Sequence, residues 1–320
     1  MTAAAVLLMA FGSAQPNVDS ARRYLAQMSG CDPSMAHVTD LVDRLRIIGG
    51  SPLGAITALQ ATRLEAELLR RHGPRRFSVH VVMRYGSPAP EDVLGAIPDE
   101  SSIALLPLSA HDSADRRQYR ARLDEAMTAT ERIPGDVVEI GAFGAHPDFL
   151  TLLVRRLRPV LRDAGDSAPV IFTAHSLPQA MAGSGDYAAA IGAMASRLAS
   201  ACELPDTRWR VAFQSRPRNS RQEWLGPALE DVTNEAAATT DDAVVVSPVQ
   251  FLCDHLEVLY DIDVVARRIV EGHGRRLIRP QMLNADADLI SLCADLVDAT
   301  DLAVAAEPTV RRRTLISQVR

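Results

Sequence analysis

The chain reads Ala243-Val244-Val245-Val246-Ser247-Pro248-Val249 over one short stretch that holds almost no polar side chain. A strand with one face in water alternates apolar and polar residues, whereas a run of this kind is typical of a strand buried on both faces of a parallel sheet. Six further runs share the pattern: Ala4–Ala10, Phe77–Met83, Ile103–Leu108, Val137–Ala142, Val170–Ala174 and Arg210–Phe213. The sequence therefore predicts seven strands, most of them inside parallel sheets.

Segments with the periodicity of amphipathic helices separate the predicted strands. Pro147 lies near the first turn of one such segment, where proline is favoured. The apolar face of that helix is formed by Leu150, Leu153, Val154, Leu157 and Leu161. Two more helices are predicted near residues 184–201 and 285–297. The repeated alternation of strand and helix predicts an α/β fold with two doubly wound, Rossmann-like parallel sheets.

The predicted elements fall into two comparable halves, joined near residues 142–147. We expect an N-terminal domain at residues 1–145, a C-terminal domain at 146–305 and a flexible tail at 306–320. A chain of 320 residues is long enough for two domains. In open parallel sheets, ligands bind beyond the carboxyl ends of the strands. We therefore expect the active site in the cleft between the two domains, built from polar residues that directly follow strands.

The composition argues against several classes of protein. The net charge of −6 argues against binding to nucleic acid, because neutralising phosphates needs a basic face. All 34 basic residues are arginines, and arginine suits carboxylate ligands through its bidentate fork. The apolar stretch at residues 3–11 is too short to cross a membrane and lacks a basic flank. We expect a cytoplasmic protein without a transmembrane segment.

Four cysteines lie far apart, at positions 31, 202, 253 and 293. Because no two of them form a Cys-x-x-Cys pair, neither a zinc site nor an iron–sulfur cluster has support from local sequence. Isolated cysteines also fit a reducing compartment. We expect no [2Fe-2S] cluster and no permanently bound cofactor.

Ionisable side chains follow two of the predicted strands. His175 lies in the run Phe172-Thr173-Ala174-His175-Ser176-Leu177-Pro178, and Glu257 and Asp261 lie in the segment that begins at Asp254. If that segment is helical, the two carboxylates lie one turn apart on the same face. With His175 they would form a nitrogen–oxygen site suited to a divalent metal such as Fe²⁺. Each signal alone is weak, because a lone histidine after a strand is more often a packed residue than a ligand.

The same two segments resemble known signatures. Residues 247–263, SPVQFLCDHLEVLYDID, are similar to the C-terminal signature of ferrochelatases, and residues 172–178 are similar to their active-site histidine motif. Further blocks resemble the family in the same order along the chain: Leu7–Gly12, Ile48–Leu53, Met83–Gly86, Trp209–Ser215, Trp224–Pro227 and Arg279–Asn284. The resemblance covers roughly residues 4–300, and on it the chain is identified as a member of the ferrochelatase family.

The resemblance implies an enzyme that inserts Fe²⁺ into a porphyrin, coproporphyrin III or protoporphyrin IX, in haem synthesis. It also implies that His175 and Glu257 face each other across the porphyrin, where they handle the metal and remove the pyrrole protons. Which residue has which role stays open, because imidazole and carboxylate can both bind a metal or accept a proton. Asp261 would extend a metal-binding track from Glu257. Relatives often have another carboxylate one turn further on, and Val265 in that place puts an outer metal site in doubt, although Asp263 can partly substitute.

The family's pattern also marks residues that would bind the porphyrin. These substrate-binding candidates are Phe11, Arg44, Ser51, His111 and Tyr119. Arg44 and Ser51 match contacts to the porphyrin propionates in bacterial relatives, while Tyr119 is one residue off the family's spacing. Some coproporphyrin-using relatives have a tyrosine where this chain has Phe11, which can stack on the ring but offers iron no hydroxyl. Residues 13–17 are polar where membrane-associated members have an apolar lip, which favours coproporphyrin III.

Two alternatives stay open. One is a chelatase for another metal, such as cobalt or nickel, or for another tetrapyrrole. The other is a porphyrin- or haem-binding paralogue that has lost turnover, which Phe11 and Val265 motivate and the presence of both His175 and Glu257 argues against. We expect porphyrin and ferrous iron as partners, no nucleic acid, and a monomer.

Overall fold

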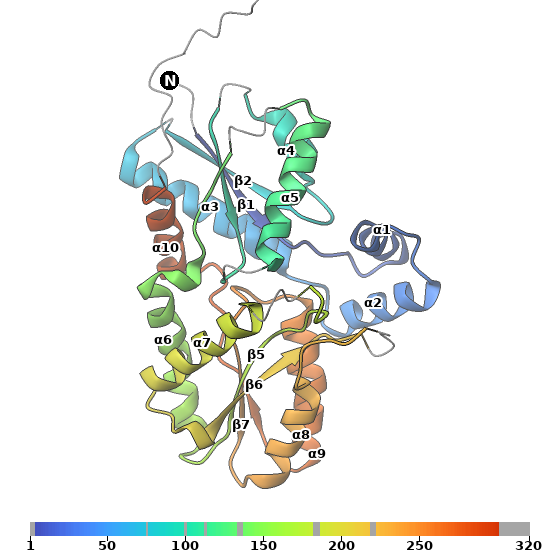
Figure 1. Ribbon diagram of the computed structural model, residues 1–320, viewed down its shortest axis with the longest axis vertical. Coiled ribbons are helices and arrows are strands. Elements are labelled where there is room, and N and C mark those ends of the chain that lie inside the picture. Colours follow the sequence, from blue (N-terminus) through green and yellow to red (C-terminus); the bar gives the residue numbers. More distant parts are fainter. Residues whose placement is uncertain are drawn as a thin grey trace, which may run out of the picture.

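Two four-stranded parallel sheets with flanking helices form the fold, which confirms the predicted α/β class (Figure 1). The computed structural model describes residues 4–74, 76–98, 101–111, 114–132, 137–181, 186–217 and 222–300, so the predicted tail at 306–320 lies outside the described residues. The strand order is β2-β1-β3-β4 in the first sheet and β6-β5-β7-β8 in the second. In both sheets the order reverses beside the first strand, between β1 and β3 and between β5 and β7.

The strands agree closely with the predicted apolar runs. β1 (Ala4–Ala10) and β2 (Phe77–Met83) have the predicted bounds. The bounds of five more differ from the prediction by one to three residues: β3 (Ile103–Pro107), β4 (Val137–Glu139), β5 (Val170–His175), β6 (Trp209–Gln214) and β7 (Val244–Pro248). The sequence did not predict β8 (Leu277–Ile278), because two residues are too few to show a period.

The three predicted helices are present, along with others. In the first half the helices are α1 (Val18–Ser29), α2 (Met35–Ile47), α3 (Leu53–His72), α4 (Pro90–Ala96) and α5 (Ala114–Ala129). Later in the chain they are α6 (Pro147–Ala164), α7 (Asp186–Ala201), α8 (Leu229–Thr239), α9 (Arg267–Gly272) and α10 (Ala287–Asp298). Short 3₁₀ turns lie at Phe143–Ala145 and Asp206–Arg208, and η4 (Val258–Ala266) is a π-helix.

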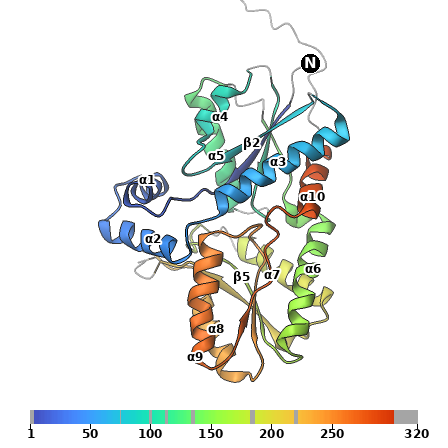
Figure 2. The same ribbon diagram turned by 180° about the vertical axis from the view of Figure 1, so that it is seen from behind.

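Helices cover both faces of each sheet (Figures 1 and 2). In the first half, α3 packs on one face and α4 and α5 pack on the other. In the second half, α6 and α7 cover one face, and α8, η4 and α9 cover the other. The largest apolar cluster includes Leu64 of α3, Leu157 of α6 and Leu289 of α10. The two halves therefore share one core, while the boundary near residue 145 stays a prediction.

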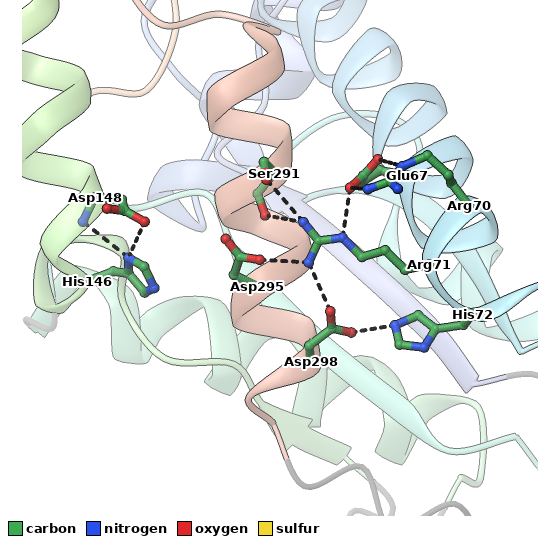
Figure 3. Close-up of polar contacts among 9 residues, drawn as sticks. All are labelled: Glu67, Arg70, Arg71, His72, His146, Asp148, Ser291, Asp295 and Asp298. Carbon is green, nitrogen blue, oxygen red and sulfur yellow. Dashed lines mark hydrogen bonds and ion pairs between the residues drawn. The ribbon is translucent and has the colours of Figure 1, made fainter.

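Helix α10, the last helix among the described residues, is joined to α3 by Arg71 (Figure 3). The Nη1 atom of Arg71 lies 2.7 Å from Asp295 and 2.9 Å from Asp298, and Nη2 donates to Ser291 at 3.0 Å. Its Nε donates to Glu67, in its own helix, at 2.7 Å. The Arg71 side chain is 18% exposed, so these ion pairs are shielded from most of the solvent. An element near the end of the chain is thus held against the first half.

The carboxyl ends of the two sheets meet. His111, which follows β3, lies 3.0 Å through Nε2 from the backbone oxygen of Val249, which follows β7. A hairpin of α1 and α2 projects to the side of this junction (Figure 2). Its apolar cluster also contacts Leu256, just before η4. Ligands of doubly wound sheets bind where the strand order reverses, so this junction is where the fold itself places a site.

Candidate active site

His175 and Glu257 contact each other at this junction. His175 is the last residue of β5, at the edge where the strand order reverses. Its Nδ1 lies 2.9 Å from Oε2 of Glu257, and the two side chains are 29% and 27% exposed. The pair is thus shielded from bulk water but accessible. The structure brings together the two residues that were predicted to be catalytic.

The Glu257 side chain is ionised at neutral pH. Burial favours its neutral form, but the His175 charge, the His175 hydrogen bond and the nearby His255 outweigh this and lower the pKa of Glu257 to about 2. A carboxylate can only accept, so the shared hydrogen lies on Nδ1 of His175. When the imidazole is neutral, this tautomer leaves the ring's lone pair on Nε2.

Two buried glutamines hold the backbone of the pair. Gln214, the last residue of β6, donates from Nε2 to the Glu257 carbonyl at 3.0 Å, and its Oε1 accepts from Thr173 at 3.1 Å. Gln250, two residues beyond β7, accepts at Oε1 from the His175 backbone N–H at 2.8 Å. The sequence reasoning missed both residues. Their signal was the one used for His175, a polar side chain at the carboxyl end of a buried strand.

Asp261 lies on the π-helix and is tied to Ser215. The Ser215 hydroxyl donates to Oδ2 of Asp261. Burial and the charge of Glu257 raise the pKa of Asp261 to about 7, although the Ser215 hydrogen bond opposes the shift. The φ of Ser215 is 67°, in the left-handed region that non-glycine residues seldom adopt. The segment is helical, as assumed, but η4 has the i→i+5 bonding of a π-helix, a form that is frequent at functional sites.

A preformed metal cluster is absent from the described part of the chain, where no three His, Cys, Asp or Glu side chains lie close enough to hold an ion. His175 and Glu257 contact each other, whereas Asp261 is hydrogen-bonded to Ser215. The charge of Glu257 acts on Asp261 by raising its pKa. The metal-binding role of the three residues stays a prediction.

Phe11 and Tyr119 lie around one cation, Arg84. The Arg84 Cζ is 5.5 Å from the centre of the Phe11 ring, 5.6 Å from that of Tyr119 and 4.8 Å from that of Tyr85, all within cation–π range. A cavity of about 440 Å³ opens beside Arg84 and Tyr85. Arg84 lies in one of the blocks that resemble the family, and its signal in the sequence is that of a charged residue directly after a strand.

Tyr24 of α1 packs edge-on against Tyr85, with ring centres 6.4 Å apart. Its hydroxyl donates to the Gly12 carbonyl at 3.3 Å. Burial raises the pKa of Tyr24 above its ordinary value, and the charge of Glu257 adds to the increase while Arg84 opposes it. Helix α1 thus adds an aromatic side chain to the group around Arg84 and Tyr85.

The remaining predicted substrate contacts lie in different settings. Arg44 of α2 stacks over the Tyr260 ring at 5.2 Å and pairs with Asp40 at 2.9 Å, while its buried Nε has no hydrogen-bond partner among the described residues. Ser51 accepts weakly from the backbone N–H of Leu53 at 3.5 Å, just before α3. His111 is only 5% exposed and bonds to backbone. Arg44 thus lies beside the π-helix, whereas His111 lies in the interior.

Comparison with known proteins decides the family. The family model described as Ferrochelatase matches residues 3–301. The chain belongs to the ferrochelatase family. The ferrochelatase of Thermus thermophilus is 32% identical over 318 residues, covering 92% of this chain and 98% of the relative. The coproporphyrin III ferrochelatase of Geobacillus thermodenitrificans is 31% identical over 304 residues, covering 91% and 94%.

Solved structures share the fold. SirB from Bacillus subtilis with Fe³⁺ has a TM-score of 0.57 at 12% identity and covers 95% of this chain and 97% of SirB. CbiX, the terminal enzyme of sirohaem biosynthesis in denitrifying bacteria, has a TM-score of 0.54 at 16% identity, with coverages of 92% and 98%. At such identities the likeness concerns the fold alone.

Membership in the ferrochelatase family confirms the predicted reaction, which is the insertion of iron into a porphyrin in haem synthesis. A chelatase for another metal and a paralogue without turnover are no better supported. Among the described residues, no helix combines the length and the apolar character needed to cross a membrane.

Proposed function

We propose that this ferrochelatase takes Fe²⁺ and coproporphyrin III as substrates, and that His175 and Glu257 carry out the insertion. The observation that carries the proposal is the 2.9 Å contact between His175 Nδ1 and Glu257 Oε2 where the strand order reverses. Coproporphyrin III is supported by a relative that bears its name and by Arg44, whose buried Nε has no acceptor in the part of the protein that the structure describes. Its four propionates offer more carboxylates to arginine than the two of protoporphyrin IX.

The pair has the chemistry that insertion requires. Two pyrrole protons must leave the ring, and Fe²⁺ must lose its water. The lone pair on His175 Nε2 can accept a proton while Nδ1–H stays bonded to Glu257, whose carboxylate then stabilises the imidazolium. Imidazole nitrogen and carboxylate oxygen also suit Fe²⁺. Because the pair offers fewer ligands than a closed metal site, a bound ion can still pass to the ring.

Further residues complete the proposed site. Asp261, with a pKa of about 7, is the outer position of the acidic track that begins at Glu257. We assign Arg44 and Ser51 to the propionates, and Phe11 and Tyr119 to the face of the porphyrin. The edge-on contact of Phe11 with Tyr85, with ring centres 5.2 Å apart, gives Phe11 a fixed orientation for stacking.

The proposal includes a monomeric, cytoplasmic enzyme without a permanently bound cofactor. Burial raises the pKa of Cys253 and of Cys293 to about 12, which keeps both as thiols at neutral pH. Only thiolates are good metal ligands, so these two side chains are poor candidates for a cluster. Cys31 is exposed and Cys202 is half-buried, and all four cysteines are free.

Anaerobic assays with Fe²⁺ and each porphyrin test the function by the absorbance of the product. We expect faster insertion into coproporphyrin III, and a loss of about 100-fold or more in kcat for H175A and for E257Q. A matched control is H273A, because His273 is exposed and its Nε2 lies 2.9 Å from Oδ1 of Asn234, away from the His175–Glu257 pair; it should keep its activity. No metalloporphyrin with either substrate would refute the function, and full activity of H175A would refute the site. Co²⁺ or Ni²⁺ insertion that outpaces Fe²⁺ would favour the other-metal chelatase.

A further inference from the structure

We propose that Gln250 and Tyr187 are positioning residues, which fix the backbone of His175 and thereby keep its imidazole against Glu257. The inference rests on the proposed function, because it takes His175 as a residue of the insertion step. It adds two buried residues that act on the rate through the position of His175.

Gln250 completes a sheet that the backbone leaves incomplete. β5 and β7 pair in parallel, and the N–H of Val249 donates to the Thr173 carbonyl at 3.0 Å. In a continuous parallel ladder, the next bond would join the N–H of His175 to the carbonyl of Val249. That carbonyl accepts from His111 Nε2 at 3.0 Å, and Oε1 of Gln250 accepts from His175 at 2.8 Å. A side chain has thus replaced the backbone acceptor at the catalytic position.

Tyr187 holds the other polar group of the His175 backbone. It is the second residue of α7, and its hydroxyl lies 2.8 Å from the His175 carbonyl and 2.7 Å from Oε1 of Gln250. The two acceptors share the single hydroxyl hydrogen, so Tyr187 bridges the His175 carbonyl and the Gln250 side chain. Tyr187 is fully buried and Gln250 is 8% exposed. Buried hydrogen bonds are costly to break, because a group left unpaired there has no water to replace its partner. Both polar backbone groups of His175 are therefore held by buried side chains.

The imidazole depends on this arrangement for its place. A shift of the His175 backbone moves Nδ1 away from Glu257, and a misplacement of about 1 Å can cost a reacting group about 100-fold in rate. Glu257 has a separate tether, since Gln214 donates to its carbonyl. Loss of the Gln250 bond therefore displaces one member of the pair and leaves the other in place.

Loss of the Gln250 or Tyr187 contact should lower kcat. Because Gln250 and Tyr187 are buried, neither can contact the porphyrin, so their loss should leave KM for the porphyrin nearly unchanged. A purely structural role would instead lower the amount of folded enzyme and leave the kcat of the folded fraction unchanged.

The test compares Q250M, which keeps the volume but removes the acceptor, with Y187F, which keeps the ring but removes the hydroxyl. Kinetics are measured anaerobically with Fe²⁺ and the porphyrin that the wild type uses. We expect kcat to fall about tenfold or more in Q250M and several-fold in Y187F, with KM within about twofold. In wild-type protein, histidine-ring NMR should show the Nδ1–H of His175 as a downfield proton bonded to Glu257. This signal should weaken in both variants.

Q60M is the matched control. Gln60 of α3 is 1% exposed and donates from Nε2 to the Asn284 carbonyl at 2.6 Å. Its replacement therefore removes a buried side-chain hydrogen bond between α3 and the loop before α10. It should lower the thermal midpoint but leave kcat within about twofold. Unchanged kcat and an unchanged Nδ1–H signal in both Q250M and Y187F would overturn the proposal, as would an equal loss of kcat in Q60M. A wild type that makes no metalloporphyrin would instead refute the proposed function.

Discussion

The guanidinium of Arg44 has hydrogen-bond donors that its partners in the protein satisfy only in part. Nη2 pairs with Asp40, and the guanidinium lies over Tyr260, but the buried Nε donates to nothing in the described structure. A buried donor left unpaired costs about 1–3 kcal/mol, a cost that is recovered when a ligand supplies the acceptor. A propionate carboxylate meets that need.

Replacement of Arg44 by alanine should therefore weaken binding of the porphyrin and leave the chemical step intact. We expect R44A to raise KM for coproporphyrin III about tenfold, with kcat within about twofold. The control is R46A, two residues along the same helix, where Arg46 is 62% exposed and lies 3.9 Å from Asp43. Steady-state kinetics with both porphyrins provide the measurement. A fall in kcat with unchanged KM would contradict the assignment of Arg44 to the propionates.

Local sequence predicts only those residues of the site that lie in a recognisable signature. His175 and Glu257 lie in segments with a specific signature, and the structure brings them into contact. Gln250 acquires its role because His111 occupies the carbonyl of Val249, 138 residues further along the chain, which a regular ladder would have used. No local pattern encodes that exchange. It follows only from the arrangement of two sheets.

At the scale of elements, Arg71, which joins α3 to α10, is held within α3 by Glu67, whose charge depends on pH. Hydrogen bonds from Arg70 and Arg71 lower the pKa of Glu67 to about 2 from its ordinary 4.5, although burial opposes the shift. A carboxyl group with a lowered pKa adds stability above its unfolded pKa, and this contribution is lost as the pH falls through the folded pKa. The window for Glu67 therefore lies between about pH 4.5 and pH 2.

The E67Q variant should show this dependence. We expect its free energy of unfolding at pH 7 to be about 1–2 kcal/mol below that of the wild type, with the difference shrinking below about pH 4.5 and lost only below about pH 2. Urea unfolding at several pH values measures it. E235Q is the control, because Glu235 and Arg210 form a pair about two-thirds exposed that should contribute less than about 0.5 kcal/mol. A difference for E67Q that stays constant down to pH 2 would contradict the role of its ionised form.

Elements with a strong local pattern were predicted, and those that depend on distant packing were not. The apolar runs gave β1 and β2 with their observed bounds. The π-helix η4 could not be distinguished from an α-helix, because its apolar residues have a spacing that suits both. The contact of α10 with α3 likewise could not be predicted from the sequence of either helix alone, because Arg71 and Asp295 are 224 residues apart.

At the scale of the whole molecule, the two sheets share a core. The largest apolar cluster contains Leu64 and Leu68 of α3 as well as Phe172 of β5, and α10 contributes to it from the far end of the chain. Domains that share a core lose apolar burial on both sides when either one opens. We therefore expect the two halves to unfold together.

Replacement of Leu64 tests this cooperativity, because the two tryptophans, Trp209 and Trp224, both lie in the second half. Leu64 is fully buried in the first half, so L64A should destabilise the protein by about 2–5 kcal/mol. If the halves unfold together, the midpoints from tryptophan fluorescence and from far-UV circular dichroism should shift by the same amount. L69A, which removes a 53% exposed leucine from the same helix, should leave both midpoints nearly unchanged. A fluorescence midpoint that stays in place in L64A while the dichroism transition splits would show that the halves unfold separately, since the second half would then be insensitive to a defect in the first.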